Sequence, residues 1–108
     1  MALRDQPYLP LYVKNVLTDV NLIECSAESH GVYFRLLCIL YMQKPCREIC
    51  LKQKDKQSDQ QVKNFAIKLG RSMPFSVDVI ESSINELVTE DVLEINGDIL
   101  SQKRICHE

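Results

Sequence analysis

Lysine and arginine side chains gather in the middle of this 108-residue sequence, and the chemistry they offer is anion binding. Residues 44–71 hold eight Lys or Arg against three Asp or Glu, a balance of +5. Residues 72–108 hold two Lys or Arg against eight Asp or Glu, a balance of −6. Such a split indicates a charged partner, and Lys and Arg supply most non-specific affinity for nucleic-acid phosphates. The predicted phosphate contacts are Lys52, Lys54, Lys56, Lys63, Lys68, Arg71, Lys103 and Arg104.

The cysteines and histidines make no convincing catalytic or metal site. Cys46 and Cys50, taken with Cys106 and His107, lack the spacing of the common zinc fingers. His30 has no nucleophile and orienting acid in a recognisable pattern, so packing or capping is the simpler interpretation of this residue. The sequence also has no Gly-rich phosphate loop. We therefore predict no metal, no cofactor and no enzymatic activity.

The composition is that of a small globular domain. Hydrophobic residues at 45% and charged residues at 26% argue against disorder. A chain of this length suits one domain with a single core. The odd number of five cysteines favours reduced thiols over a disulfide framework. Because the N-terminus shows no signal-peptide pattern, we expect a cytoplasmic protein with no membrane association.

A long apolar helix over residues 26–43 is expected to organise the domain. Ser26 can cap its first turn, and Glu28 suits the positive end of the helix dipole. The run ends before Pro45 and is too short for a membrane span. A helix this apolar should be surrounded by other elements. Gly31 within it predicts the close approach of another backbone.

Residues 58–90 are expected to form two helices joined by a short turn. Ser58 and Gln61 match a capping box for the first helix, and Gly70 suits a left-handed C-cap at its end. Ser76 can cap the second helix. The apolar faces follow helical spacing, with Val62, Phe65, Ala66 and Leu69 on the first helix and Val77, Ile80, Ile84, Leu87 and Val88 on the second.

A β-hairpin over residues 92–105 completes the predicted fold. Asn96-Gly97 is a strong hairpin signal, and the loop either pairs Ile95 with Asp98 or, if longer, with Ile99. A short strand over residues 47–53 would be its third partner. Residues 1–25 are expected to form an arm that docks through Tyr8, Leu9, Leu11 and Tyr12. This arm would include a short helix over Val13–Val20 and a connection over Asn21–Cys25. The fold class is mainly α with a small hairpin (α+β), a single winged helix-turn-helix domain over residues 1–108.

The sequence resembles the N-terminal winged-helix domain of phage and prophage replication proteins, the replisome organisers and primosome-type initiators. That group includes phage domains of unknown function. The similar stretches are Pro7–Tyr12 (PYLPLY), Glu28–Leu37 (ESHGVYFRLL) and the ending Gly97–Ile105 (GDILSQKRI), where the family closes its wing with a Lys/Arg pair. The Lys52–Gln57 loop departs from the family by being more basic and polar. A further domain often follows in the family, which leaves open that these residues belong to a longer protein.

The resemblance implies a non-catalytic DNA-binding role in replication initiation, with weak sequence specificity. Partners would be DNA and replication proteins such as a helicase or its loader. The second helix, which would normally enter the major groove, carries Asp78, Glu81 and Glu86 on its outer face and would repel phosphate. The alternative is a winged-helix protein-interaction or homo-oligomerisation module, in which basic and acidic segments pair between copies. Both charged runs can also be solvated faces without a partner.

Overall fold

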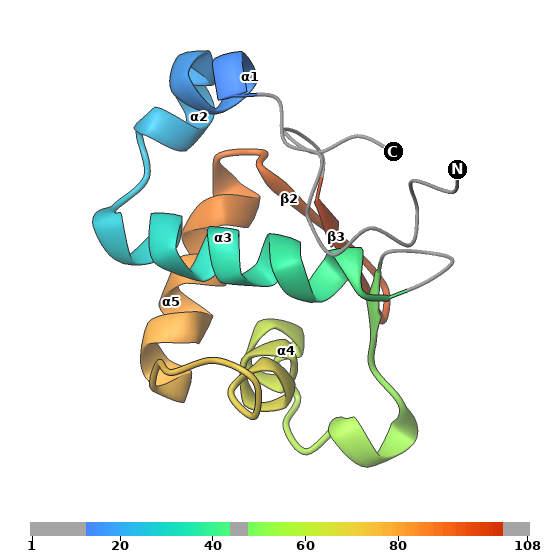
Figure 1. Ribbon diagram of the computed structural model, residues 1–108. Helices are drawn as coiled ribbons and strands as arrows, with labels where there is room; N and C mark the ends of the chain where they lie inside the picture. Colours follow the sequence, from blue (N-terminus) through green and yellow to red (C-terminus); the bar gives the residue numbers. More distant parts are fainter. Residues whose placement is uncertain (1–12, 44–47, 103–108) are drawn as a thin grey trace, which may run out of the picture.

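In the described chain, other helices pack against one long central helix, and a small sheet lies beside them (Figure 1). The structure is a computed structural model that describes residues 13–43 and 48–102. Its elements, in order, are α1 (Val13–Thr18), α2 (Val20–Ile23), α3 (Ala27–Tyr41), β1 (Ile49–Cys50), the 3₁₀ turn η2 (Gln53–Asp55), α4 (Gln61–Leu69), α5 (Val77–Thr89), β2 (Leu93–Asn96) and β3 (Ile99–Gln102). The coarse prediction of a mainly helical α+β domain that ends in a hairpin is therefore confirmed.

The central helix α3 lies within the predicted range of residues 26–43 and is shorter than it by one residue at the start and two at the end. Ser26 Oγ accepts the backbone N–H of Ser29 at the N-cap, and Met42 is the C-cap residue. The buried face of α3 packs across α5, as Figure 1 shows. The helix is not covered on all sides, however. A stripe at helical spacing (Gly31, Arg35, Cys38 and Met42) stays exposed, so the expectation of a fully surrounded helix is wrong.

Among the described residues, Gly31 lies against a side chain and not against another backbone. A Cβ atom at Gly31 would lie 3.5 Å from the ring of Phe75, in the link between α4 and α5. The predicted neighbours of Gly31 in the N-terminal arm, Tyr8 to Tyr12, lie outside the described residues.

Two short helices, not one helix and a connection, precede α3. The side chain of Asp19 accepts the N–H groups of Asn21 and Leu22 and so begins α2 where the chain was predicted to run on as a connection. His30 Nε2 lies 2.8 Å from the carbonyl oxygen of Leu22 and donates a hydrogen bond to it. This bond closes the end of α2 against α3, so of the two predicted roles of His30, packing or capping, the structure shows capping.

The capping box predicted for α4 is wrong, because α4 begins two residues later than expected. Gln60 is the N-cap residue, and Ser58 Oγ instead accepts the N–H of Gln60. Ser58 is held by Asn64, whose side chain exchanges two hydrogen bonds with the Ser58 backbone. The Gln61 side chain turns away from the helix start and reaches the hairpin.

Gly70 ends α4, but with φ −60° it is right-handed and not left-handed as predicted. Its small size matters for packing. A Cβ atom there would lie 3.2 Å from the Ala66 carbonyl oxygen and 3.4 Å from a Val77 methyl group at the start of α5. The predicted Ser76 cap of α5 is confirmed, since Ser76 Oγ accepts the N–H of Val79.

The end of α5 is a Schellman motif that sequence reasoning missed. The N–H of Val92 donates to the Leu87 carbonyl oxygen, and the N–H of Asp91 donates to that of Val88. Asp91 takes the left-handed conformation with φ 65°. Glycine is usual at this position, and here aspartate, one of the residues that tolerate this region, replaces it.

Replacing Asp91 with valine should lower the free energy of unfolding by about 1–2 kcal/mol, because a β-branched side chain is strained at positive φ. Urea denaturation measures this loss. Asp91→Asn is the matched control and should stay close to wild type. Equal stability of the valine variant would show that residue 91 is not left-handed.

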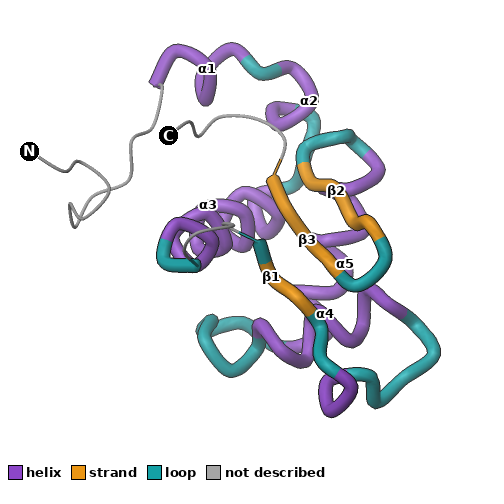
Figure 2. Tube along the Cα trace, turned by 90° about the vertical axis from the view of Figure 1, so that its right-hand side faces the viewer, coloured by secondary structure: helices purple, strands orange, loops and turns teal. Residues whose placement is uncertain are grey.

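The hairpin forms in a register different from both predicted alternatives. Ile95 pairs with Leu100 and Asn96 with Ile99, so the loop is Gly97-Asp98. Gly97 stands first in that loop with φ +60°, the place where a II′-type loop needs glycine. The short strand β1 pairs antiparallel with β3, as predicted, although it spans fewer residues. Figure 2 shows β3 between β1 and β2.

Side chains from α2 through β3 form a single buried core. Tyr33, Leu36, Phe65, Ile84 and Leu100 are all fully buried. In contrast, three large apolar side chains on α1 and α2 are more than half exposed: Leu17, Val20 and Ile23. Within residues 13–43 and 48–102, no helix is both long and apolar enough to cross a membrane.

Candidate nucleic-acid interface

The carboxyl group of Asp55, in a loop predicted to be merely polar, is the centre of the basic region. Its side chain is only 2% exposed. It accepts the backbone N–H of Lys52 at 2.9 Å and the Lys68 ammonium at 2.9 Å, and Arg71 lies 3.9 Å away. The Lys52 hydrogen bond first, and then the Lys68 bond, hold the pKa of the Asp55 carboxyl below its usual range. Asp55 thus ties η2 to the end of α4.

Lys68 therefore has a structural role beside any contact with a ligand. Its ammonium also donates to the Cys50 carbonyl oxygen at 2.9 Å. That oxygen belongs to β1, an edge strand of the sheet. A lysine on an edge strand's backbone blocks pairing with another chain. The predicted phosphate contact at Lys68 is thus largely engaged inside the domain.

Lys56 is engaged as well, with the tip of the hairpin. Its ammonium lies 2.7 Å from the Asp98 carboxyl, and the Gln61 side-chain amide donates to the same carboxyl at 3.0 Å and to the Gly97 carbonyl oxygen. The Lys56 bond and then the Gln61 bond lower the pKa of Asp98. These contacts fasten the hairpin tip to the start of α4.

The other predicted cations divide between exposed positions and the undescribed end of the chain. Lys52, Lys54 and Lys63 are exposed, and the Arg71 side chain is 60% exposed. Lys103 and Arg104 lie outside the described residues. The structure gathers Lys52, Lys68 and Arg71 around one hollow, while Lys54 lies on η2, which packs against α4, and Lys63 on α4 itself.

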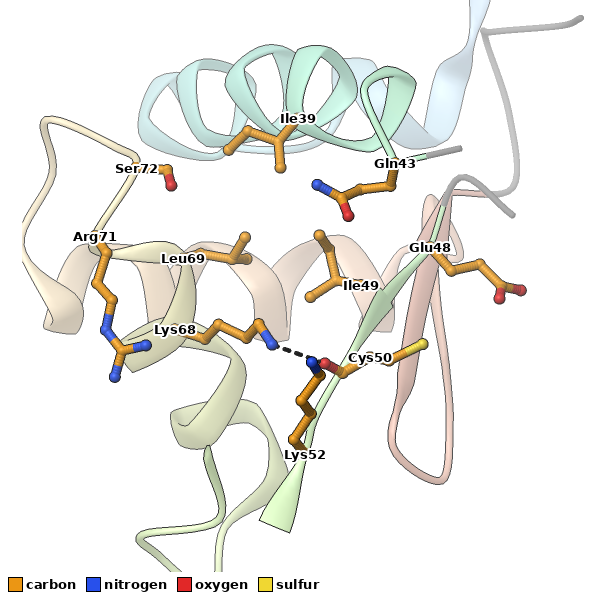
Figure 3. Close-up of a pocket in the computed structure, with 10 residues that line it drawn as sticks. All are labelled: Ile39, Gln43, Glu48, Ile49, Cys50, Lys52, Lys68, Leu69, Arg71 and Ser72. Carbon is orange, nitrogen blue, oxygen red and sulfur yellow. Dashed lines mark hydrogen bonds between the residues drawn. The ribbon is translucent and has the colours of Figure 1, made fainter. Parts of the chain in front are cut away.

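This hollow is an open pocket of about 430 Å³ between α3, β1 and the end of α4. Ile39, Ile49 and Leu69 give it an apolar floor, and Gln43 contributes an amide from just beyond the end of α3. Figure 3 shows Lys68 reaching across to the Cys50 carbonyl group. The pocket can hold an anionic group attached to an apolar body.

The acidic face predicted for α5 is only partly a solvated face. Glu86 accepts hydrogen bonds from the Ser26 backbone N–H at 3.1 Å, the Ser26 hydroxyl at 3.0 Å and the Ser29 hydroxyl. It therefore caps the N-terminus of α3, where the helix dipole also favours an anion. The Ser29 bond first, then those of Ser26, lower the pKa of Glu86. Asp78, at the start of α5, remains exposed.

Replacing Glu86 with glutamine should make the domain less stable at neutral pH but not in acid. A lowered folded-state pKa means that Glu86 stabilises the fold above its ordinary pKa of 4.5, and this stabilisation is lost as pH falls through the folded-state value. Urea midpoints at neutral pH and at about pH 3 test this. The difference in urea midpoint between the variant and the wild type should disappear in acid. Glu81→Gln removes one charge from the same helix and should show no such convergence with the wild type.

The cysteines described by the structure are free thiols. Burial and then the nearby Glu86 raise the pKa of the Cys25 thiol to about 11, so it is unreactive at neutral pH. Cys38 and Cys50 are exposed. Within residues 13–43 and 48–102, no group of three or more His, Cys, Asp or Glu side chains is placed to hold a metal ion. Cys46, Cys106 and His107 lie outside the described residues.

Sequence reasoning missed Asp55, Gln43 and Arg35 as parts of this region. Arg35 lies on the exposed stripe of α3, and its Nε donates to the Ser72 carbonyl oxygen at 3.3 Å. An acidic residue inside a run of lysines was the available signal for Asp55. Gln43 carried no such signal. Comparisons of the chain with models of protein families, with curated proteins and with solved structures found no match.

Proposed function

We propose that the domain is a winged helix-turn-helix. The support is the order of its elements: a central helix, a short strand, two helices joined by a turn, and a hairpin that pairs with the short strand. In this interpretation α4 and α5 are the helix-turn-helix and the β2–β3 hairpin is the wing. The hairpin tip is fastened to α4 through Gln61 and to the end of η2 through Lys56.

We propose that the domain binds DNA without catalysis, as part of a phage- or prophage-type replication protein. The observation that carries this proposal is a set of four exposed cations: Lys52 just before η2, Lys54 on η2, Lys63 on α4 and Arg71 just beyond α4. Such cations hold phosphates with little regard to sequence. Lys103 and Arg104 stay predicted phosphate contacts outside the described residues.

The DNA would lie across α4 and the loop between β1 and η2, and α5 would not enter the major groove. Two carboxylates of α5, Asp78 and Glu81, would face the phosphates in the usual docking, and α5 has no Lys or Arg to offset them. This arrangement supports placement of replication machinery on DNA more than the reading of a base sequence.

Fluorescence anisotropy with a labelled random duplex and a labelled single strand tests the proposal. Salt is varied from about 50 to 200 mM. The affinity should fall steeply along that range, because the release of counterions from the DNA favours binding less at higher salt. A lack of binding to either strand at low salt would refute the DNA-binding role.

The second candidate is a protein-interaction module. The observation in its favour is that two predicted phosphate contacts, Lys56 and Lys68, are ion-paired within the domain. The exposed apolar side chains of Leu17, Val20 and Ile23 also suit a protein partner or a second copy. Analytical ultracentrifugation at rising protein concentration, with and without salt, would detect the second copy.

A further inference from the structure

The pocket between α3, β1 and α4 joins two properties that a flat phosphate-binding surface lacks. It is concave, and it places an apolar floor beside cations. The floor comes from three separate elements: Ile39 is only partly buried, whereas Ile49 and Leu69 lie beneath it as core residues that are 5% and 2% exposed. Its volume of about 430 Å³ lies within the range of small-ligand sites.

The cations at this pocket retain hydrogen-bonding capacity. Asp55 is already satisfied by the Lys52 N–H and the Lys68 ammonium. The Arg71 guanidinium lies 3.9 Å from Asp55 and is 60% exposed, so most of its five donors can still reach an incoming anion. The Lys52 side chain is exposed. The one acidic residue of the lining, Glu48, points away from Lys68 and Arg71 in Figure 3.

A stacked duplex does not fit such a site, because its bases are enclosed and its phosphates lie on a convex surface. An unpaired strand can turn a single nucleotide out of its stack, and proteins bind such strands through a cationic track beside apolar platforms. Lys54 on η2 and Lys63 on α4 are exposed on two elements that pack against each other, and their ammonium groups can hold neighbouring phosphates of the strand.

We propose that this pocket takes one unpaired nucleotide of a single DNA strand. The phosphate contacts Arg71 and Lys52, and the sugar and base lie on Ile39, Ile49 and Leu69. This inference rests on the proposed DNA-binding function and adds a preference for single strands to it. None of the described lining residues is aromatic, so discrimination between bases should be weak.

The test compares two variants that carry the same change. Gln43→Glu places a carboxylate in the pocket, and Gln57→Glu places one on an exposed loop residue outside its lining. Affinities for a thymidine oligonucleotide and for a duplex of equal length are measured by anisotropy at low salt. Thermal unfolding of both variants checks that the fold is intact.

Wild type should bind the single strand more tightly than the duplex. Gln43→Glu should weaken single-strand binding about tenfold while changing duplex binding about twofold or less, and Gln57→Glu should weaken both to the same small degree. Equal wild-type affinity for both strands, or the same behaviour of both variants, would overturn the pocket inference and leave the DNA-binding proposal standing. Binding to neither strand would overturn both.

Discussion

Phe65→Ala is expected to remove most of the stability of the domain. Phe65 is fully buried on α4 and belongs to the core that α3, α5 and the sheet share. Truncating a buried phenylalanine costs about 3–5 kcal/mol, from lost burial and from the cavity that remains. A domain of this size has total stability of about 5–15 kcal/mol, so the variant will be partly unfolded at modest temperature.

Urea denaturation followed by circular dichroism measures this loss. Phe34→Ala is the matched control, because Phe34 is the same residue type but only half-buried on α3, and its loss should be smaller. Equal losses for the two variants would contradict the packing of α4 into the core. The loss also has a functional consequence, since α4 positions Lys63, Lys68 and the following Arg71.

Local signals in the sequence predicted most elements of the fold. The Ser26 and Ser76 caps depend on a side chain and a backbone N–H three residues away, so residue type and spacing are sufficient to predict them. The same reasoning failed at Ser58, because tertiary hydrogen bonds replace the capping box that local spacing predicted there. Asn64 binds the Ser58 backbone and Gln61 binds the hairpin, and neither contact is visible in a local pattern.

The hairpin register and the glycine conformations were also not predictable from local sequence patterns. The sequence predicted Asp98 or Ile99 as the cross-strand partner of Ile95. The structure pairs Ile95 with Leu100, because Gly97 and not Asn96 takes the first position of the loop. A left-handed backbone was predicted at Gly70, yet what crowds this position is the Ala66 carbonyl oxygen and the Val77 side chain. At the C-terminal end of α5, the left-handed residue is Asp91 and not a glycine.

The candidate site was predictable in composition but not in arrangement. The cations of residues 44–71 were evident, but which of them are engaged depends on where two carboxyl groups lie. Asp55 takes up Lys68, and Asp98, from a distant segment, takes up Lys56. Glu86, predicted as part of a repelling face, instead caps α3. Charge counts along a sequence cannot resolve such pairings, because the partners meet only in the fold.

Replacing Lys52, Lys54 and Lys63 together with glutamine should abolish most DNA binding while leaving the fold intact. All three side chains are exposed, so none of them supports the core. Removing three phosphate contacts should make the slope of log affinity against log salt shallower by about three. The affinity at low salt should fall about a hundredfold, which exceeds the effect expected of any single change at the pocket.

The control for this triple variant places the same change in net charge on α5. Ser82→Glu, Asn85→Glu and Thr89→Glu all alter exposed positions of that helix. If DNA lies across α4 and the loop, this control should keep most of its affinity, because exposed charges farther than about 10 Å from a phosphate are largely screened at 0.1 M salt. The opposite result, in which the α5 variant loses binding and the lysine variant keeps it, would place the DNA on α5 as in the usual winged-helix docking.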